Sequence, residues 1–107
     1  MTIFSKIVRG ELPCKKVYES DEFLAFYDIA PKAKVHILAI PKRELKDFND
    51  ITPELMGRFS AFILEVVEVA GIKQSGYRLI TNTGTDSGQE VPHLHFHILG
   101  GERLGGI

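Results

Sequence analysis

This chain has little of several features that would direct a protein toward particular classes of function. Its 107 residues include one cysteine and no tryptophan. A single cysteine excludes an intramolecular disulfide, so the fold has to be held together by a packed core. Cys14 follows Pro13 in a turn and has no base near it in the sequence. We interpret it as incidental rather than as a catalytic thiol.

The chain also lacks long apolar runs and an excess of charge of either sign. No apolar run of about 18 residues is present, and the amino terminus does not show the basic and then apolar pattern of a secretion signal. The formal net charge of −1 at pH 7 provides no electrostatic footprint for nucleic acid. We therefore expect a cytoplasmic protein with no nucleic-acid or membrane partner, in which any bound anion is held by local contacts.

What is present is the composition of one small globular domain. Hydrophobic residues make up 44% of the chain and charged residues 25%, which are ordinary values for a folded protein. The length is sufficient for a single core. We expect one domain over residues 1–107, in which the glycine-rich segment 99–107 forms a flexible tail.

Hydrophobic periodicity predicts two helices. Thr2 can cap a short helix whose apolar stripe ends before Gly10. A longer helix is expected to begin after Thr52, a suitable N-cap followed by proline at the first helical position, and to run to Ala70 before Gly71. Its apolar residues recur at intervals of three and four, so this stripe is expected to lie in the core.

Five apolar segments bounded by turn residues are predicted to be strands. Their ranges are Lys15–Glu19, Phe23–Ile29, Val35–Ile40, Tyr77–Thr81 and Val91–Leu99. Three strands, a helix and two further strands predict an α+β domain with an antiparallel sheet packed on its long helix. Such a sheet leaves one face open for chemistry.

The most informative segment lies within the last predicted strand. Three of the four histidines, His93, His95 and His97, occupy alternate positions of an apolar run. Because the side-chain period of a strand is two, the three imidazoles are expected to share one face while the intervening apolar side chains fill the other. Clustered imidazoles that become cationic near neutral pH cost stability, so a purely structural role explains this row poorly.

The residues alone leave two kinds of chemistry open. Neutral imidazole is a common zinc ligand, but positions i and i+4 of a strand are about 13 Å apart, so one ion could not easily bind all three rings. Two rings could share an ion with a ligand from elsewhere, and the only other histidine is His36. Alternatively, one imidazole attacks phosphorus while a second, about 7 Å along the face, contacts the phosphate or protonates the leaving group. The preceding loop 83–89 is rich in small residues whose N–H groups can approach phosphate oxygens.

Blocks along nearly the whole chain resemble the histidine triad superfamily. Residues 88–101 are similar to its signature H-x-H-x-H-x-x, in which x is apolar. Further similar blocks, in the same order, lie at 3–7, 11–13, 25–31, 36, 40–42, 76–78 and 82. The branch that the chain most resembles is the bacterial type of the histidine triad nucleotide-binding proteins.

This resemblance implies a fold and an activity. The fold is a five-stranded antiparallel sheet with one long and one short helix, joined into a ten-stranded sheet in a homodimer. The activity is the hydrolysis of purine nucleoside 5′-phosphoramidates to a nucleoside monophosphate and an amine, through a nucleotidyl-histidine and without a cofactor.

By position, the resemblance also implies a role for each site residue. His95 is the nucleophile, His97 contacts the phosphate and helps to protonate the leaving amine, and His93 and His36 orient and polarise the row. Asp28 accepts the ribose hydroxyls. The purine is sandwiched by Phe4, Ile7, Phe26 and Ile29. The phosphate is held by Asn82, Gln89 and the backbone around Val91, with Glu90 beside it.

Three departures from the family pattern bear on these expectations. Glu90 stands where many eukaryotic members carry serine, and it adds a negative charge near an anionic substrate. Thr2 and Ser5 stand where zinc-binding branches carry cysteines, so we expect no metal. The tail lacks the tryptophan-containing end with which some members select the leaving group.

Two alternative functions are also compatible with the sequence. One is the hydrolysis of dinucleoside polyphosphates, as in a sister branch of the superfamily. The other is a nucleotide-binding or protein-interaction module with weak catalysis. The sequence does not identify the physiological amine.

Overall fold

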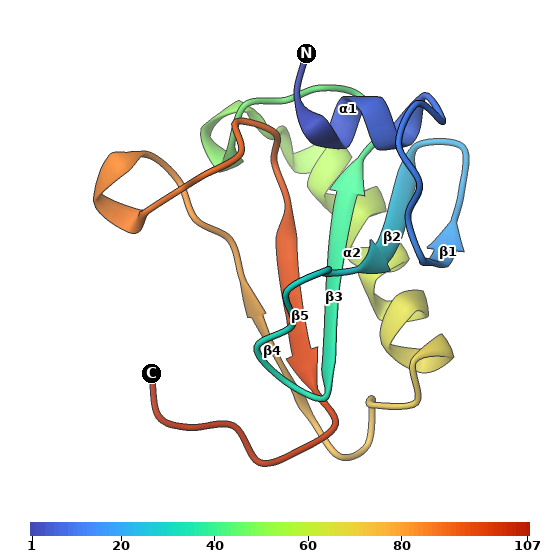
Figure 1. Ribbon diagram of the computed structural model, residues 1–107, viewed down its shortest axis with the longest axis vertical. Helices are drawn as coiled ribbons and strands as arrows, with labels where there is room; N and C mark the ends of the chain where they lie inside the picture. Colours follow the sequence, from blue (N-terminus) through green and yellow to red (C-terminus); the bar gives the residue numbers. More distant parts are fainter.

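A five-stranded antiparallel sheet in the order β1-β2-β3-β5-β4 organises the computed structural model, which describes residues 1–107 (Figure 1). The strands are β1 (Lys16–Glu19), β2 (Phe23–Tyr27), β3 (Val35–Pro41), β4 (Tyr77–Ile80) and β5 (Phe96–Gly100). The helices are α1 (Ile3–Val8) and α2 (Pro53–Val69), with 3-10 turns η1 (Phe48–Asp50) and η2 (Thr85–Ser87). The α+β architecture with one short and one long helix is confirmed.

The sheet separates a large apolar cluster from a small one. Helix α2 lies behind the sheet in Figure 1, and its Phe59, Val66 and Val67 are fully buried against that face. On the opposite face, Phe4 of α1 packs on a cluster that also contains Leu24, Phe26, Leu38 and Ile40. Because α1 has only six residues, it covers only part of this second face. The remainder stays open beside His36 and His97.

Both helices begin where their capping residues predict. Thr2 Oγ1 accepts a hydrogen bond from Ser5 N–H at 3.1 Å, and Thr52 Oγ1 accepts one from Leu55 N–H at 3.2 Å. Each cap satisfies one of the N–H groups that a helix start leaves without a partner. Neither helix has the length and apolar character needed to cross a bilayer.

The predicted second strand is too long. β2 ends at Tyr27 because Asp28 turns the chain, its Oδ1 accepting the Ala30 N–H at 2.8 Å. Asp28 N–H still donates to the His36 carbonyl oxygen at 3.0 Å, and the side-chain turn then directs the chain away from β3. Ile29 consequently lies outside the sheet and is 97% exposed. Smaller differences of one residue occur at the start of β1 and at the ends of β3 and β4.

The predicted start of the fifth strand at Val91 is wrong, since β5 begins at Phe96. The chain before it is held by turns: His93 N–H donates to Val91 O at 2.8 Å, and Leu94 N–H donates to Leu45 O at 2.7 Å. The alternation of faces nevertheless continues through this segment, because Leu94 is buried in the α2 cluster together with alternate residues of β5. The imidazoles therefore share a face without sharing a strand.

The tail begins later than residue 99, because β5 continues through Gly100. At Gly101 the backbone φ is +79°, and a Cβ would lie 2.8 Å from Val35 Cγ2, so the turn requires glycine. Two contacts attach the segment that follows: Lys34 N–H donates to Glu102 at 2.7 Å, and Arg78 donates to the Gly105 carbonyl oxygen at 2.8 Å.

Phe59 is the site at which we expect the largest loss of stability upon truncation. Its ring stacks on Phe23 at 4.8 Å and meets Phe96 edge-on at 5.6 Å. Phe59→Ala should lower the free energy of unfolding by about 3–5 kcal/mol in urea denaturation. The matched control is Phe48→Ala, since that ring is 42% exposed. Equal losses for the two variants would contradict this account of the core.

Candidate active site

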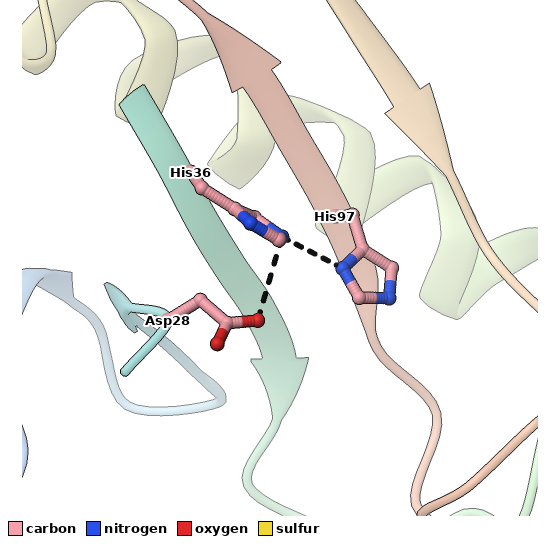
Figure 2. A group of neighbouring side chains, drawn as sticks. All are labelled: Asp28, His36 and His97. Atoms are coloured by element: carbon pink, nitrogen blue, oxygen red, sulfur yellow. Dashed lines mark hydrogen bonds and ion pairs between the residues drawn. The ribbon is translucent and has the colours of Figure 1, made fainter. Parts of the chain in front are cut away.

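The open face of the sheet brings His36 and His97 together. β3 and β5 pair so that His36 lies opposite Leu99 and Leu38 opposite His97, which makes the two histidines diagonal neighbours on one face. His36 Nε2 lies 2.9 Å from His97 Nδ1. Asp28, just beyond β2, points at the same ring, with its Oδ2 at 3.4 Å from His36 Nε2 (Figure 2).

A backbone group determines where His36 and His97 carry their protons. Lys32 N–H donates to His36 Nδ1 at 3.0 Å, so neutral His36 carries its proton on Nε2. That proton is donated to His97 Nδ1. Neutral His97 must then carry its own proton on Nε2. His97 is therefore fixed as a hydrogen-bond donor through Nε2.

A second backbone group fixes His95 in the opposite tautomer. His95 Nδ1 lies 2.7 Å from the His93 carbonyl oxygen, which can only accept, so Nδ1 carries the proton. Nε2 of neutral His95 consequently keeps its lone pair. His95 and His97 lie with ring centroids 5.1 Å apart, so a nucleophilic nitrogen and a donor nitrogen belong to adjacent rings.

His93 is held at both ring nitrogens and is fully buried. Its Nε2 donates to the Pro41 carbonyl oxygen at 2.8 Å, and its Nδ1 lies 3.0 Å from Thr2 Oγ1. No ring nitrogen remains for a substrate. His93 contributes to the site through its carbonyl oxygen, which accepts the hydrogen bond from His95 Nδ1.

The two ring nitrogens with chemical roles are also accessible. Every side-chain nitrogen or oxygen that is fully buried has a hydrogen-bond partner within the chain. Nε2 of His95 and Nε2 of His97 have no such partner, so they must reach solvent. Neither nitrogen is therefore sealed inside the protein.

Burial keeps the imidazoles neutral. It lowers the pKa of His97 to about 4, and the neighbouring His95 and His36 act in the same direction. Burial likewise lowers the pKa of His36 and that of His93. At neutral pH these rings are therefore uncharged, as the tautomers above require.

A pocket of about 460 Å³ lies over this part of the open face. Of the residues expected from the sequence it contains Asp28, His36, Asn82, Glu90 and His97. Its other walls are Ala30, Lys32, Ile80, Gly88 and Leu99. His95 does not line it but adjoins it through the ring of His97. A larger cavity of about 720 Å³, between the end of α2, β4 and the tail, contains none of the expected residues.

The residues expected to hold the phosphate differ in whether their hydrogen-bonding groups already have partners within the chain. The Asn82 side chain and the Val91 N–H make no hydrogen bond within the chain, so both remain available as donors. The Gln89 side chain is occupied: its Oε1 accepts the Gly84 N–H at 2.9 Å, and its Nε2 donates to the Lys46 carbonyl oxygen at 2.9 Å. In this arrangement Gln89 braces the loop before the triad.

The residues expected to sandwich the purine are only partly assembled. Phe4 meets the rings of Phe26 and His95 edge-on, at 5.6 and 5.0 Å between centroids, and Ile7 packs on the same cluster. Ile29 is exposed and stands apart from them. Cys14 is half-buried beside this cluster, and burial raises the pKa of its thiol, which agrees with an incidental role.

Asp28, His36 and His97 are the only group whose side-chain atoms converge as metal ligands do, within 4.8 Å of one another. The tautomer of His36 opposes this use. Its Nε2 carries a proton because Lys32 N–H occupies Nδ1, so Nε2 has no lone pair for an ion. Binding a metal there would require moving the proton to Nδ1, where it would face a second donor.

Lys32 is the residue of this site that the sequence did not indicate. Its backbone N–H orients His36 and its side chain lines the pocket. The turn at Pro31 placed it near Asp28, but no spacing rule predicts that an N–H four residues earlier will cap an imidazole.

Comparison with known proteins agrees with the expected family. Residues 9–104 match the HIT domain family. An uncharacterised HIT-like protein of Helicobacter pylori is 60% identical over 103 residues, which cover 96% of this chain and 99% of that protein. A purine nucleoside phosphoramidase of Escherichia coli K12 is 47% identical over 107 residues, covering 97% of this chain and 90% of the relative.

Solved structures agree in fold. A HIT-like protein superimposes with a TM-score of 0.93 at 61% identity, covering 95% of this chain and all of that one. A histidine triad protein from Clostridium difficile gives a TM-score of 0.91 at 44% identity, covering 98% and 94% of the two chains. With the family matched over most of its length and relatives this similar in sequence and fold, the chain belongs to the HIT domain family.

Proposed function

We propose that this protein is a hydrolase that cleaves purine nucleoside 5′-phosphoramidates to a nucleoside monophosphate and an amine. The observation that carries the proposal is the tautomer of His95, whose proton is held at Nδ1 by the His93 carbonyl oxygen while the accessible Nε2 keeps its lone pair. The name of the 47% identical Escherichia coli relative supports the substrate class.

The reaction proceeds in two displacements at phosphorus. His95 Nε2 attacks the phosphorus, the phosphorus–nitrogen bond to the amine breaks, and its electron pair leaves with the amine, which takes up a proton. The His95 ring then carries a positive charge, and its proton stays on Nδ1, which donates a hydrogen bond to the His93 carbonyl oxygen. Water next attacks the phosphorus, releases a proton, and returns the electron pair of the phosphorus–histidine bond to Nε2.

The remaining site residues bind and orient the nucleotide. His97 donates a hydrogen bond from Nε2 to a phosphoryl oxygen or to the departing nitrogen. The proton that the amine takes up comes from solvent and is balanced by the proton that water releases in the second displacement. Asn82, the Val91 N–H and the Lys32 ammonium supply further donors and positive charge for the phosphate. Asp28 retains unused lone pairs on its carboxylate for the ribose hydroxyls. The purine lies on the apolar side, near Phe4, Ile7, Phe26 and Ile29.

A homodimer and a cytoplasmic setting remain predictions. The homodimer is supported by β4, an edge strand whose Leu79 is 42% exposed, and by the exposed Leu64 and Val69 of α2, at 53% and 57%. Edge strands with exposed apolar residues are typical places for a second chain to pair. No cofactor, nucleic acid or membrane is part of the proposal.

Removing the nucleophile is the direct test. His95→Gly should lower kcat on adenosine 5′-phosphoramidate by on the order of a thousandfold or more, because no other imidazole presents a free lone pair. Binding of adenosine monophosphate should persist, and added imidazole should restore part of the turnover. Diadenosine tetraphosphate serves as the comparison substrate. Undiminished turnover in the variant, or a higher kcat/KM on the tetraphosphate in the wild type, would reject the proposal.

The pKa of His97 should report the arrival of a phosphate. In the free protein burial lowers this pKa to about 4. A bound anion favours the charged imidazolium, so adenosine monophosphate should raise the pKa and should bind more tightly as the pH falls toward it. NMR titration of the His97 ring measures both states. Adenosine, which lacks the phosphate, is the control ligand. If the His97 ring titrated at the same pH with adenosine as with adenosine monophosphate, the phosphate would not lie beside His97.

Glu90 should favour cationic or neutral leaving groups over anionic ones. Its carboxylate is exposed on the pocket wall that His97 also lines, and it forms no ion pair within the chain. Glu90→Gln should raise kcat/KM about three- to tenfold for a phosphoramidate whose amine bears a carboxylate, relative to one whose amine is cationic. Asp86→Asn, on the same loop but outside the pocket, should leave this ratio unchanged. If Asp86→Asn changed this ratio and Glu90→Gln did not, Glu90 would not contact the leaving group.

A further inference from the structure

A polar cluster surrounds one edge of the His93 ring, where α1 meets the chain after β3. It consists of Thr2, Ser5, Glu44 and His93. Thr2 Oγ1 lies 3.0 Å from His93 Nδ1 and 3.1 Å from Ser5 Oγ. Ser5 Oγ donates to Glu44 Oε1, which also accepts the Thr2 N–H at 3.3 Å. Ser5 and His93 are both buried.

For neutral His93 the shorter contacts of this cluster assign its protons, since Ser5 Oγ lies farther from His93 Nδ1, at 3.5 Å, than Thr2 Oγ1 does. Its Nε2 donates to the Pro41 carbonyl oxygen, so its Nδ1 must accept. Thr2 already accepts the Ser5 N–H as helix cap and is therefore free to donate its hydroxyl proton to Nδ1. Ser5 in turn donates its hydroxyl proton to the Glu44 carboxylate. Every proton thus has one acceptor.

We infer that Thr2, Ser5 and Glu44 are positioning residues for the nucleophile His95. They hold the His93 ring from one side while Pro41 holds it from the other. A ring fixed at both nitrogens fixes the adjoining peptide, and the carbonyl oxygen of that peptide is the acceptor for His95 Nδ1. This inference rests on the proposed function, since it assigns these residues to the same reaction.

The position of the His93 carbonyl oxygen matters most during the reaction. When His95 Nε2 bonds to phosphorus the ring becomes cationic, and a hydrogen bond to a charged donor is stronger and more sensitive to geometry than a neutral one. A His93 ring that loses its Thr2 partner can rotate and carry the carbonyl oxygen with it. The Ser5 hydroxyl and the Thr2 N–H lower the pKa of Glu44, so the carboxylate that accepts both of these hydrogen bonds stays ionised.

The chain itself offers a matched control for the test. Thr2 and Thr52 are both helix caps with the same side-chain contact, but only Thr2 also touches His93. Thr2→Val and Thr52→Val each remove a cap and should lower the melting temperature similarly. Only Thr2→Val should lower kcat on adenosine 5′-phosphoramidate, by about five- to tenfold, with KM little changed. Thr2→Ser, which keeps the hydroxyl, should restore kcat.

Ser5→Ala tests whether the effect extends to Glu44. The substitution leaves the cap in place because the Ser5 N–H remains. It should lower kcat less than Thr2→Val does, and the double variant should lose less than the product of the two separate effects. If the loss of kcat in the double variant equalled the product of the two single losses, Ser5 and Glu44 would act independently of Thr2.

A measurement that does not depend on turnover separates this inference from the proposed function. In the wild type, NMR of the histidine rings should show His95 protonated at Nδ1, with its proton shifted downfield by the His93 carbonyl oxygen. Thr2→Val should weaken that shift or populate the other tautomer, while Thr52→Val should not. An unchanged His95 resonance in Thr2→Val, or equal kcat values for the two valine variants, would overturn the inference. If the wild type lacked phosphoramidase activity but the NMR result held, only the proposed function would fail.

Discussion

The hydrogen bond from His95 Nδ1 to the His93 carbonyl oxygen is the interaction on which the chemistry of this protein depends. An imidazole in water exchanges its proton between two nitrogens, so its nucleophilic atom is not fixed. A buried carbonyl oxygen removes that freedom because it can only accept. The same bond remains available when the ring becomes cationic, so in the proposed reaction it would stabilise His95 both before and after it bonds to the nucleotide. The reactivity of His95 is thus determined by a backbone group two residues earlier.

The neighbouring histidines follow the same rule, and this explains how a cluster of four imidazoles can be buried without loss of the fold. His93 is fixed by the Pro41 carbonyl oxygen and His36 by the Lys32 N–H, while His97 is fixed indirectly through His36. Each contact satisfies a nitrogen that burial would otherwise leave without a partner. Burial also lowers the pKa of His36, His93 and His97, so these three rings do not repel one another at neutral pH. The same hydrogen bonds from backbone groups thus stabilise the buried rings and determine which nitrogens can react.

This dependence on the backbone also sets the limit of what the sequence could predict. The caps at Thr2 and Thr52, the long helix and the alternation of faces around the triad depend on local patterns, and these predictions are confirmed. The strand starting at Val91 was wrong because the Leu94 N–H bonds to Leu45, far away in the sequence. The tautomers depend on similarly distant or conformation-specific backbone groups, for which side-chain identity carries no signal. The pocket assembled five of the expected residues because their side chains, rather than their backbones, form its walls.

The charges at the pocket lead us to expect an amine rather than a phosphate as the leaving group of the proposed reaction. Lys32 and Glu90 line one pocket of about 460 Å³, so a substrate meets a positive and a negative group within the same small space. A phosphoramidate matches this pair, because it is anionic at the phosphoryl oxygens and basic at the departing nitrogen. A dinucleoside polyphosphate is anionic on both sides of the attacked phosphorus, so part of its chain would lie near the Glu90 carboxylate. Repulsion between like charges in a partly desolvated pocket is costly. Glu90, the residue by which this chain departs most clearly from the eukaryotic pattern, is thus a reason, separate from the tautomer of His95, to propose cleavage of the phosphorus–nitrogen bond.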